Sequence, residues 1–267
     1  MAPAPARPLL LNQLGGPVAA ALNEYAEQVD IITGERESTA PWVTHGADIL
    51  LTGPSRSWAT APTTPPPEWG NGPKWVQIAS AGIDSYPHWL TRGRLVTCGR
   101  GDAATPIAEY VLSAMLQHER QVDAFRPTSP TTWEAFLAPL RQAPVTGTLN
   151  GKTLGLAGYG AIGHAIAHRA CAFGMQVHAF KRSPWQTQPE GLNTAPTLAS
   201  LFERADHLVL AMPLTPETRG IITTDILRHA RPNLHLINVA RGALINQNAL
   251  LAALDAGRPA FATLDVT

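Results

Sequence analysis

The sequence has little cysteine and no long apolar run, and its charges of opposite sign balance. Its 267 residues include two cysteines, Cys98 and Cys171, too few for a disulfide framework and outside any Cys-x-x-Cys or Cys/His metal spacing. No apolar run approaches the roughly 18 residues of a membrane span. Lysine plus arginine and aspartate plus glutamate number 20 each, which indicates neither a nucleic acid nor an anionic membrane as partner. We expect reduced cysteines in apolar surroundings, no metal site and a small-molecule ligand.

The amino-terminal segment MAPAPARPLLLNQLGG also lacks the features of a signal peptide, because prolines interrupt it and its leucine run is short. The sequence therefore favours a cytoplasmic protein. Charged residues make up 15% of the chain, below the usual share of about 25%, while hydrophobic residues, at 45%, are ordinary for a globular protein. A chain of this length can form two modest domains, each with its own core.

Strand-like and helix-like segments alternate through the first hundred residues. Strands are expected over residues 8–14, 29–33, 48–52, 74–80 and 95–98, and a helix over residues 18–28. The proline-rich stretch 53–72 is expected to be a surface loop. The loop GRGDAAT at 99–105 leads into Pro106, which suits the first turn of a helix with an apolar stripe as far as Leu116. We therefore place a domain boundary near residue 100.

The second part of the chain repeats the pattern after residues 126–148, which have few periodic features and are expected to be an arm or connecting loop. Strands are expected from Leu154, at Val177 and over 207–211, 234–240 and 261–266, and helices after the first strand and over 198–204, 224–230 and 248–256. This alternation predicts an α/β protein of two lobes, each a parallel doubly wound sheet. Ligands of such sheets bind beyond the carboxyl ends of the strands.

The clearest motif lies within residues 152–183. An apolar strand leads into Gly158-Tyr159-Gly160-Ala161-Ile162-Gly163, and an apolar helical stripe follows. In such a unit the first glycine permits the turn, the second lets the backbone approach a pyrophosphate, and the third lets the helix pack on the strand. The first turn of the helix offers unpaired N–H groups to the phosphates. The motif predicts a Rossmann dinucleotide-binding domain; glycines that serve only a tight turn are the alternative.

The residues after the second strand of this unit bear on the choice of cofactor. An NAD site would carry an acid about 20 residues beyond the glycines, to bind the ribose 2′-hydroxyl. This chain has Lys181-Arg182-Ser183 there, with no acid before Glu190. Cations and a hydroxyl suit a 2′-phosphate, so NADP is the expected cofactor and NAD is possible. A basic turn that is merely solvated is the alternative.

Two further strand ends carry motifs that, taken with GYGAIG, resemble a known family. They read AMPLTPET at residues 211–218 and NVARG at residues 238–242. Over nearly its whole length the chain is similar to the D-isomer-specific 2-hydroxyacid dehydrogenases, including the glyoxylate/hydroxypyruvate reductases. Residues 80–84 (SAGID) resemble the family's substrate-loop motif, residues 106–116 its linking helix and residues 262–266 its LDV segment.

The resemblance implies an activity and a set of site residues. It implies a flavodoxin-like substrate-binding lobe over residues 1–100, a Rossmann domain over residues 101–267, and NAD(P)H-dependent reduction of a small 2-oxo acid of the glyoxylate/hydroxypyruvate class. A homodimer through the linking helix and the arm is also implied. Arg241 resembles the arginine that binds the substrate carboxylate and polarises its carbonyl, and the N–H groups of Ala81 and Gly82 would hold the same carboxylate. The implied cofactor-binding residues are Gly158, Tyr159, Gly160, Ala161, Ile162, Gly163, Lys181, Arg182, Ser183, Met212, Pro213, Thr218, Val239, Ala240 and Asp265.

Within this set, Met212, Pro213 and Thr218 would line the cofactor groove, and the carbonyls of Val239 and Ala240 would face the nicotinamide. Asp265 would bind the nicotinamide carboxamide. The alternatives to these functional roles are structural: Arg241 could form an ion pair, and Asp265 could cap a helix.

The chain departs from the family pattern in one respect. The family's proton donor is a histidine oriented by a glutamate, both downstream of the LDV segment, and no histidine of this chain occupies a matching position. We therefore expect an enzyme truncated at its carboxyl end, with the strand at 261–266 left with an unpaired edge. The alternative function is a catalytically impaired or inactive dinucleotide-binding protein. His164 and His168 have a metal-like spacing, but on this helix they are expected to be exposed rather than ligands.

Overall fold

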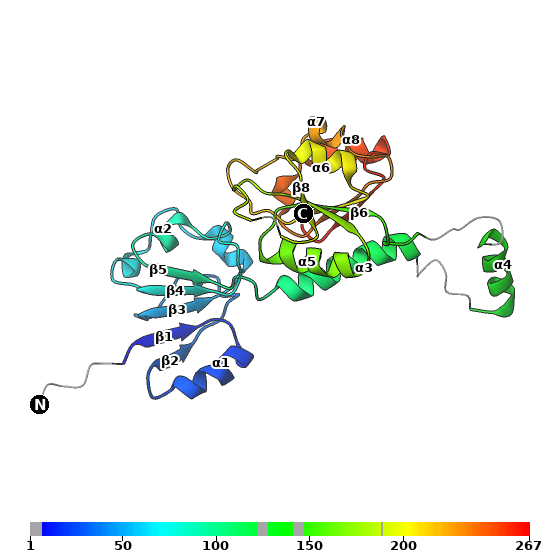
Figure 1. Cartoon of the computed structure of the whole chain (residues 1–267). Coiled ribbons are helices and arrows are strands. Elements are labelled where there is room, and N and C mark those ends of the chain that lie inside the picture. Colours follow the sequence, from blue (N-terminus) through cyan, green and yellow to red (C-terminus); the bar gives the residue numbers. More distant parts are fainter. Residues whose placement is uncertain (1–6, 122–127, 141–146, 188) are drawn as a thin grey trace, which may run out of the picture. The chain divides into compact units, whose positions relative to one another are not determined.

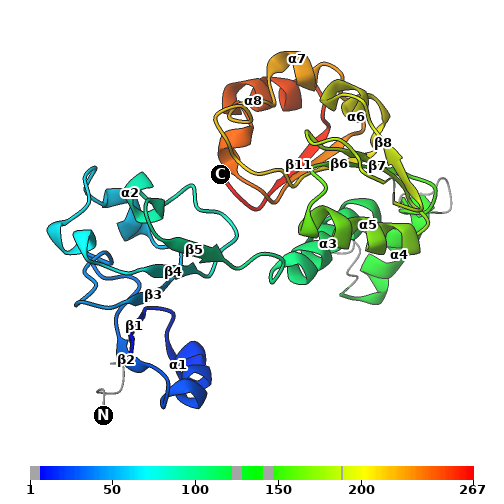
Figure 2. The same ribbon diagram turned by 60° about the vertical axis from the view of Figure 1, so that its left-hand side comes forward.

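The computed structural model describes residues 7–121, 128–140, 147–187 and 189–267 (Figure 1). The chain divides into two compact units: unit 1 ends at Asp102 and unit 2 begins at Ala103. Each unit is built on one parallel sheet with helices against it, which is visible from a second direction in Figure 2. The expected fold class, α/β with two parallel-sheet lobes, is confirmed.

Unit 1 contains a five-stranded sheet in the order β2-β1-β3-β4-β5, and every neighbouring pair is parallel. Its strands are β1 (Leu9–Asn12), β2 (Asp30–Thr33), β3 (Ile49–Thr52), β4 (Trp75–Ile78) and β5 (Leu95–Cys98). Its helices are α1 (Gly16–Leu22) and α2 (His88–Thr91), with short 3-10 turns at Asn23–Tyr25, Arg56–Thr60 and Pro67–Gly70. The helix expected over 18–28 thus ends early, at Leu22.

The proline-rich stretch 53–72 lies mostly at the surface, as its composition predicted, but two of its side chains anchor it in the core. Its two 3-10 turns place Trp58 and Trp69 in the core, at 1% and 2% exposure. The indole N–H of Trp69 donates to the carbonyl of Trp42 at 2.6 Å, and the Trp69 ring packs edge-on against Trp89. Burial of two large aromatic side chains outweighs the local preference of proline and glycine for open loops.

Unit 2 contains a six-stranded sheet in the order β11-β10-β9-β6-β7-β8, again all parallel. Its strands are β6 (Thr153–Ala157), β7 (Gln176–Phe180), β8 (Leu192–Thr194), β9 (His207–Leu210), β10 (His235–Asn238) and β11 (Phe261–Leu264). Its helices are α3 (Ala104–Arg120), α4 (Pro130–Leu140), α5 (Ala161–Ala172), α6 (Leu198–Arg204), α7 (Thr224–Leu227) and α8 (Gln247–Asp255), with a 3-10 turn at Gly242–Leu244.

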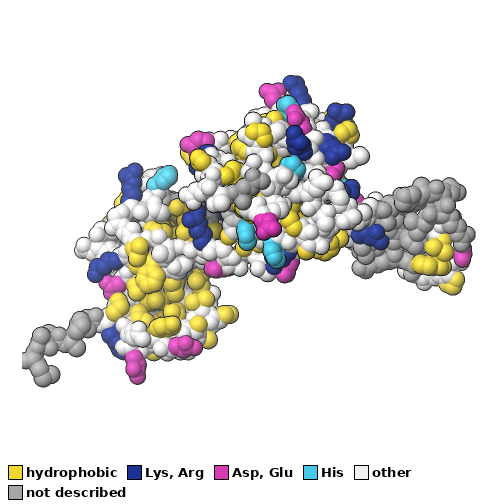
Figure 3. Space-filling view, viewed as in Figure 1, with side chains coloured by type: hydrophobic (Ala, Val, Ile, Leu, Met, Phe, Trp, Pro, Cys, Tyr) yellow, Lys and Arg dark blue, Asp and Glu magenta, His cyan; other side chains and the backbone are white. Residues whose placement is uncertain are grey.

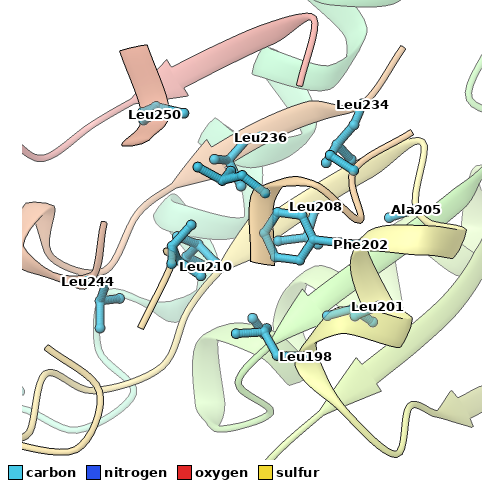
Figure 4. Packing of buried hydrophobic residues seen from close by; sticks show 14 of the residues in the cluster. Leu198, Leu201, Phe202, Ala205, Leu208, Leu210, Leu234, Leu236, Leu244 and Leu250 are labelled. Atoms are coloured by element: carbon cyan, nitrogen blue, oxygen red, sulfur yellow. The ribbon is translucent and has the colours of Figure 1, made fainter. Parts of the chain in front are cut away.

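The unit 2 sheet is covered on both faces, so its inner strands show no alternation of buried and exposed residues: β9 and β10 are buried at every position. Side chains of α3 and α5 form one core with the sheet, and those of α6, α7 and α8 form the other. Figure 4 shows the second core, in which Phe202 of α6 packs among leucines of β9 and β10. These two layers hold the strand ends, and thus the loops after them, in fixed positions.

Four local features of unit 2 differ from what the sequence predicted. The segment expected to be an arm or loop contains α4, whose start is marked by Pro130 and by Ser129, which exchanges hydrogen bonds with Thr132. Residues 126–127 and 141–146 of that segment lie outside the described residues. Strand β8 was not expected, and α7 ends at Leu227 rather than near residue 230. Cys171 is exposed on α5 instead of lying in apolar surroundings.

Within the described ranges, none of the helices combines the length and the apolar character that crossing a bilayer needs. Basic and acidic side chains are interspersed over the visible face of unit 2 (Figure 3). That distribution agrees with the equal numbers of positive and negative residues in the sequence.

A buried polar cluster lies at the amino ends of β9 and β10. His207 and His235 are fully buried, and their Nδ1 atoms are 3.1 Å apart. Nε2 of His207 is 3.1 Å from Oε1 of Glu119, which Lys152 also contacts at 3.0 Å. The ring of His118 stacks on His235 at 4.4 Å. A hydrogen bond between two imidazole Nδ1 atoms requires one of them to be unprotonated, so the cluster favours neutral histidines.

Mild acidification is therefore expected to destabilise unit 2. Burial lowers the pKa of His207 to about 4, although Glu119 opposes it, and lowers the pKa of His235 to about 3. The unfolded chain takes up these protons near pH 6.5, the ordinary histidine value. Stability is thus complete above about pH 6.5 and falls as the pH decreases below it, by up to about 1.4 kcal/mol per pH unit for each histidine.

Urea denaturation between about pH 7.5 and about pH 5 measures this slope. His207→Gln should reduce it, whereas His164→Gln, at an exposed position on α5, should leave it unchanged. A free energy of unfolding that stays constant over this range would contradict the prediction.

Candidate functional site

The loop between β6 and α5 contains three glycines. Packing requires two of them, and the third lies beside open space. Gly158 has φ +109°, and a Cβ there would lie 2.7 Å from the backbone of Ala211 and Met212. A Cβ on Gly163 would lie 2.5 Å from the carbonyl oxygen of Gly158. Gly158 therefore permits the turn and the approach to the loop after β9, and Gly163 permits close packing of α5 on that turn.

Gly160 differs, because a Cβ there would meet no atom within 4 Å. It is the N-cap of α5 and provides no side-chain hydrogen bond to the first turn. The start of this twelve-residue helix thus has no side-chain cap, and its N-cap backbone is open on the side where a Cβ would lie. We call the backbone at Gly160 and the first turn of α5 the glycine cradle. The cradle fits the pyrophosphate of a dinucleotide, because packing does not require a glycine at Gly160 and the space beside it is open.

The sheet order places this loop at a topological switch point. From β6 the chain crosses to β7 on one side, while β9 lies against β6 on the other side. Since all strands are parallel, the loops after β6, β7, β9, β10 and β11 leave from the same edge of the sheet. The cofactor-binding residues predicted from the sequence all lie at this edge or in the first turn of α5.

Hydrogen bonds within the loop after β9 fix its conformation. The Thr218 hydroxyl donates to the carbonyl of Pro213 at 2.8 Å and accepts from the N–H of Thr215 at 2.7 Å. Met212 is buried in the core, so only its backbone is available to a ligand, whereas Pro213 is exposed. Thr218, predicted to line the cofactor groove, is thus also the residue that closes this loop.

Asn238, a residue that the sequence analysis did not single out, organises the turn after β10. It is fully buried; its Nδ2 donates to the carbonyl of Arg241 at 2.9 Å, and its Oδ1 accepts from the N–H of Ala240 at 3.1 Å. Its backbone carbonyl accepts from the N–H of Asp265 at 3.0 Å, which fixes the end of β11 as well. In the sequence, Asn238 is a polar residue at the end of an apolar run, and this pattern could have marked it as a site residue.

Arg241 follows directly from this turn. Its guanidinium Nη1 donates to the carbonyl of Ala240 at 2.7 Å, and the side chain is half-buried. The Ala240 carbonyl, predicted to face the nicotinamide, is therefore already a hydrogen-bond acceptor, while Val239 is buried. This hydrogen bond fixes the orientation of the planar guanidinium, and a guanidinium fork of fixed orientation suits a carboxylate.

The basic turn after β7 has neighbours that the sequence did not reveal. The Lys181 ammonium lies 4.3 Å from the centre of the Trp185 ring, and this ring packs at 5.3 Å against Tyr159 of the glycine loop. Arg182 Nη1 lies 3.6 Å from Oε2 of Glu217. The sequence showed no acid between the turn and Glu190, but the fold brings one from the loop after β9. Ser183 is exposed beside them.

The substrate-loop motif lies in unit 1, after β4. Ala81 is exposed and Gly82 half-buried, and the Ser80 hydroxyl donates to the carbonyl of Gly82 at 2.8 Å. Burial raises the pKa of nearby Tyr86 to about 12, with Ser80 and Arg36 opposing it, so this phenol stays neutral. The loop is thus shaped by its own side chains, with the backbone at Ala81 facing solvent.

Most histidines of unit 2 lie away from the carboxyl edge of its sheet, whereas the His164 ring lies 6.0 Å from that of Tyr159 in the glycine loop. His207 and His235 begin strands, and His164 and His168 are exposed on α5, as expected. Among the residues that the structure describes, no group of three or more His, Cys, Asp or Glu side chains is placed to hold a metal ion. The described part of the edge therefore offers glycines, hydroxyls and cations, together with the carboxylates of Glu217 and Asp265.

A parallel doubly wound sheet with a glycine cradle at its switch point defines a Rossmann-type dinucleotide-binding unit. Residues 112–267 match the family model of the D-isomer specific 2-hydroxyacid dehydrogenase, NAD binding domain. The chain belongs to the D-isomer specific 2-hydroxyacid dehydrogenase family, and this stretch is its NAD-binding domain.

Individual relatives agree. The chain is 33% identical over 205 residues to glyoxylate/hydroxypyruvate reductase A of Serratia proteamaculans, covering 72% of this chain and 62% of that protein. It is 30% identical over 266 residues to D-3-phosphoglycerate dehydrogenase of Mycobacterium bovis, covering 97% of this chain and 48% of that one. The chain thus spans about half to three fifths of the length of these relatives. Apo D-mandelate dehydrogenase of Rhodotorula graminis shares the fold, with a TM-score of 0.78, 22% identity, and coverage of 98% and 81% of the two chains.

Proposed function

We propose that this protein reduces a small 2-oxo acid of the glyoxylate/hydroxypyruvate class to the 2-hydroxy acid with NAD(P)H. The observation that carries the proposal is Arg241, fixed at the carboxyl end of β10 on the sheet edge that also holds the glycine cradle. A carboxylate on the substrate is what a fixed guanidinium fork binds best. The reaction can be tested by measuring the loss of NADPH or NADH absorbance in the presence of a 2-oxo acid. Comparing glyoxylate, hydroxypyruvate, pyruvate and a phosphorylated 2-oxo acid ranks the substrates.

A bound reduced nicotinamide would supply the hydride, and the chain's own residues would do the rest. The cradle at Gly160 and the first turn of α5 would bind the pyrophosphate through backbone N–H groups. Arg241 would orient the substrate carboxylate and polarise the carbonyl as negative charge develops on its oxygen. Asp265 is proposed to bind the carboxamide, and its position is set by the hydrogen bond to Asn238. Ala81 and Gly82 are proposed as substrate-binding residues of unit 1 because of their motif.

We further propose that the phosphorylated cofactor is preferred, because Lys181 and Arg182 stand where an acid would select NAD. NADPH is expected to bind at least about tenfold more tightly than NADH, since each charge-assisted hydrogen bond to phosphate adds affinity. Arg182→Ala should narrow this difference. Fluorescence titration of both reduced cofactors measures it, with Arg228→Ala, an exposed arginine paired with Asp225 on α7, as the matched control. Equal affinities in the unaltered protein would mean that the basic turn is only solvated.

The alternative, a dinucleotide-binding protein with impaired catalysis, is favoured by one observation. Among the described residues of unit 2, no histidine lies in the turns directly after β9, β10 or β11, where Arg241 would hold the substrate and a proton donor would be needed. Cofactor titration combined with the turnover assay separates the two functions. Binding with turnover supports the reductase, and binding without turnover of any 2-oxo acid supports the alternative.

A further inference from the structure

One acidic residue stands close to the proposed 2′-phosphate site. Glu217 lies in the loop after β9 and Arg182 in the loop after β7, with β6 between these strands in the sheet. Their side chains nevertheless approach to 3.6 Å. The pair therefore spans the end of β6, above the point where the glycine loop begins. This is where a dinucleotide bound in the cradle would place its adenosine ribose.

The position of Glu217 is set by its own loop rather than by Arg182. The side chain of Thr215 and the backbone N–H of Glu217 hydrogen-bond the carboxylate and lower its pKa, with Arg182 a smaller contributor. The Thr215–Thr218 hydrogen bonds in turn hold this loop. Glu217 thus remains an anion at this place whether or not Arg182 points toward it.

A structural role would not explain the pair well. The side chains of Arg182 and Glu217 are 72% and 67% exposed, and exposed ion pairs contribute little to folding stability. The same exposure leaves both groups accessible to a ligand. A carboxylate next to the guanidinium has two effects on a phosphate that would bind there: it competes for the same N–H donors, and it repels the phosphate charge.

We propose that Glu217 is a cofactor-specificity residue that weakens binding of the 2′-phosphorylated dinucleotide by neutralising Arg182. For an unphosphorylated ribose the same carboxylate is a hydrogen-bond acceptor for the 2′-hydroxyl, so it does not oppose NADH. The balance between Arg182 and Glu217 sets how strongly NADPH is preferred. This inference rests on the proposed function, because it assumes that the cradle binds a nicotinamide dinucleotide.

The test is fluorescence titration of NADPH and NADH against the unaltered protein and Glu217→Gln, which preserves the shape and removes the charge. NADPH should bind about three- to tenfold more tightly to E217Q, and NADH should bind equally or more weakly. In the Arg182→Ala background the gain should be smaller, because the competition for the guanidinium is gone and only the repulsion of the phosphate by Glu217 remains. The gain should also shrink at high salt. Glu203→Gln, an exposed acid of α6 that contacts His229, is the control for net charge.

Unchanged affinities in E217Q, or an equal gain for both cofactors, would overturn the inference while leaving the proposed function intact. An equal NADPH gain in E203Q would overturn it too, because the effect would then come from net charge. If the unaltered protein bound neither cofactor, the proposed function would fail and this inference with it.

Discussion

Replacing Arg241 with glutamine is expected to lower kcat/KM for the best 2-oxo acid by ~10²-fold or more, with the affinity for NADPH changed less than about twofold. Glutamine can still hydrogen-bond the Ala240 carbonyl that the guanidinium contacts at 2.7 Å, so the turn after β10 should persist. It cannot present a charged fork to a carboxylate. Steady-state kinetics and cofactor titration give the two quantities.

The role of Arg241 can also be tested by ligand binding, without turnover. This test applies whether the protein is a reductase or a dinucleotide-binding protein with impaired catalysis. Oxalate, a dicarboxylate that cannot be reduced here, should bind the NADPH complex of the unaltered protein and should bind Arg241→Gln much more weakly. Arg228→Gln, which alters an exposed arginine that ends α7 and pairs with Asp225, should bind oxalate normally. Retention of full oxalate affinity and full turnover in Arg241→Gln would show that Arg241 is a structural residue.

The sequence was sufficient for features that depend on local pattern. The helix expected over 198–204 is α6 with the same bounds, and Thr197 caps it through a hydrogen bond from the N–H of Ser200. The glycine loop was likewise predicted with its strand and helix, because tight turns need glycine at fixed offsets. The parallel direction of the strands followed from the alternation of strands and helices, whereas the order of the strands in each sheet was not predicted.

Features that depend on packing between distant segments were not predictable. Trp58 and Trp69 lie in a stretch whose prolines indicate an exposed loop, and only the core that they fill shows otherwise. Glu217 is 35 residues beyond Arg182 in the chain, and no local spacing relates them. Asn238 was quoted within a motif, yet its role depends on two backbone groups that the turn brings to its amide.

Alanine at Gly160 is expected to separate folding from cofactor binding. The new Cβ would enter open space at a backbone φ of −101°, so the free energy of unfolding should fall by no more than about 1 kcal/mol, the cost of a poorer N-cap. The same methyl group would stand where the pyrophosphate approaches the backbone, and NADPH affinity should fall at least about tenfold. Urea denaturation and fluorescence titration measure the two effects on the same preparation.

Gly158→Ala is the matched contrast, because it adds the same methyl group one turn of the loop away. Its Cβ would lie 2.7 Å from the backbone of Ala211 and Met212 at a φ of +109°, so the conformational strain alone should cost about 1–3 kcal/mol of stability. The loop after β9 would also have to move, and that loop carries Thr218 and Glu217. If Gly160→Ala binds NADPH as tightly as the unaltered protein, the open space beside α5 does not hold the pyrophosphate. If it instead destabilises the fold as much as Gly158→Ala does, Gly160 serves the turn alone, which is the alternative that the sequence left open.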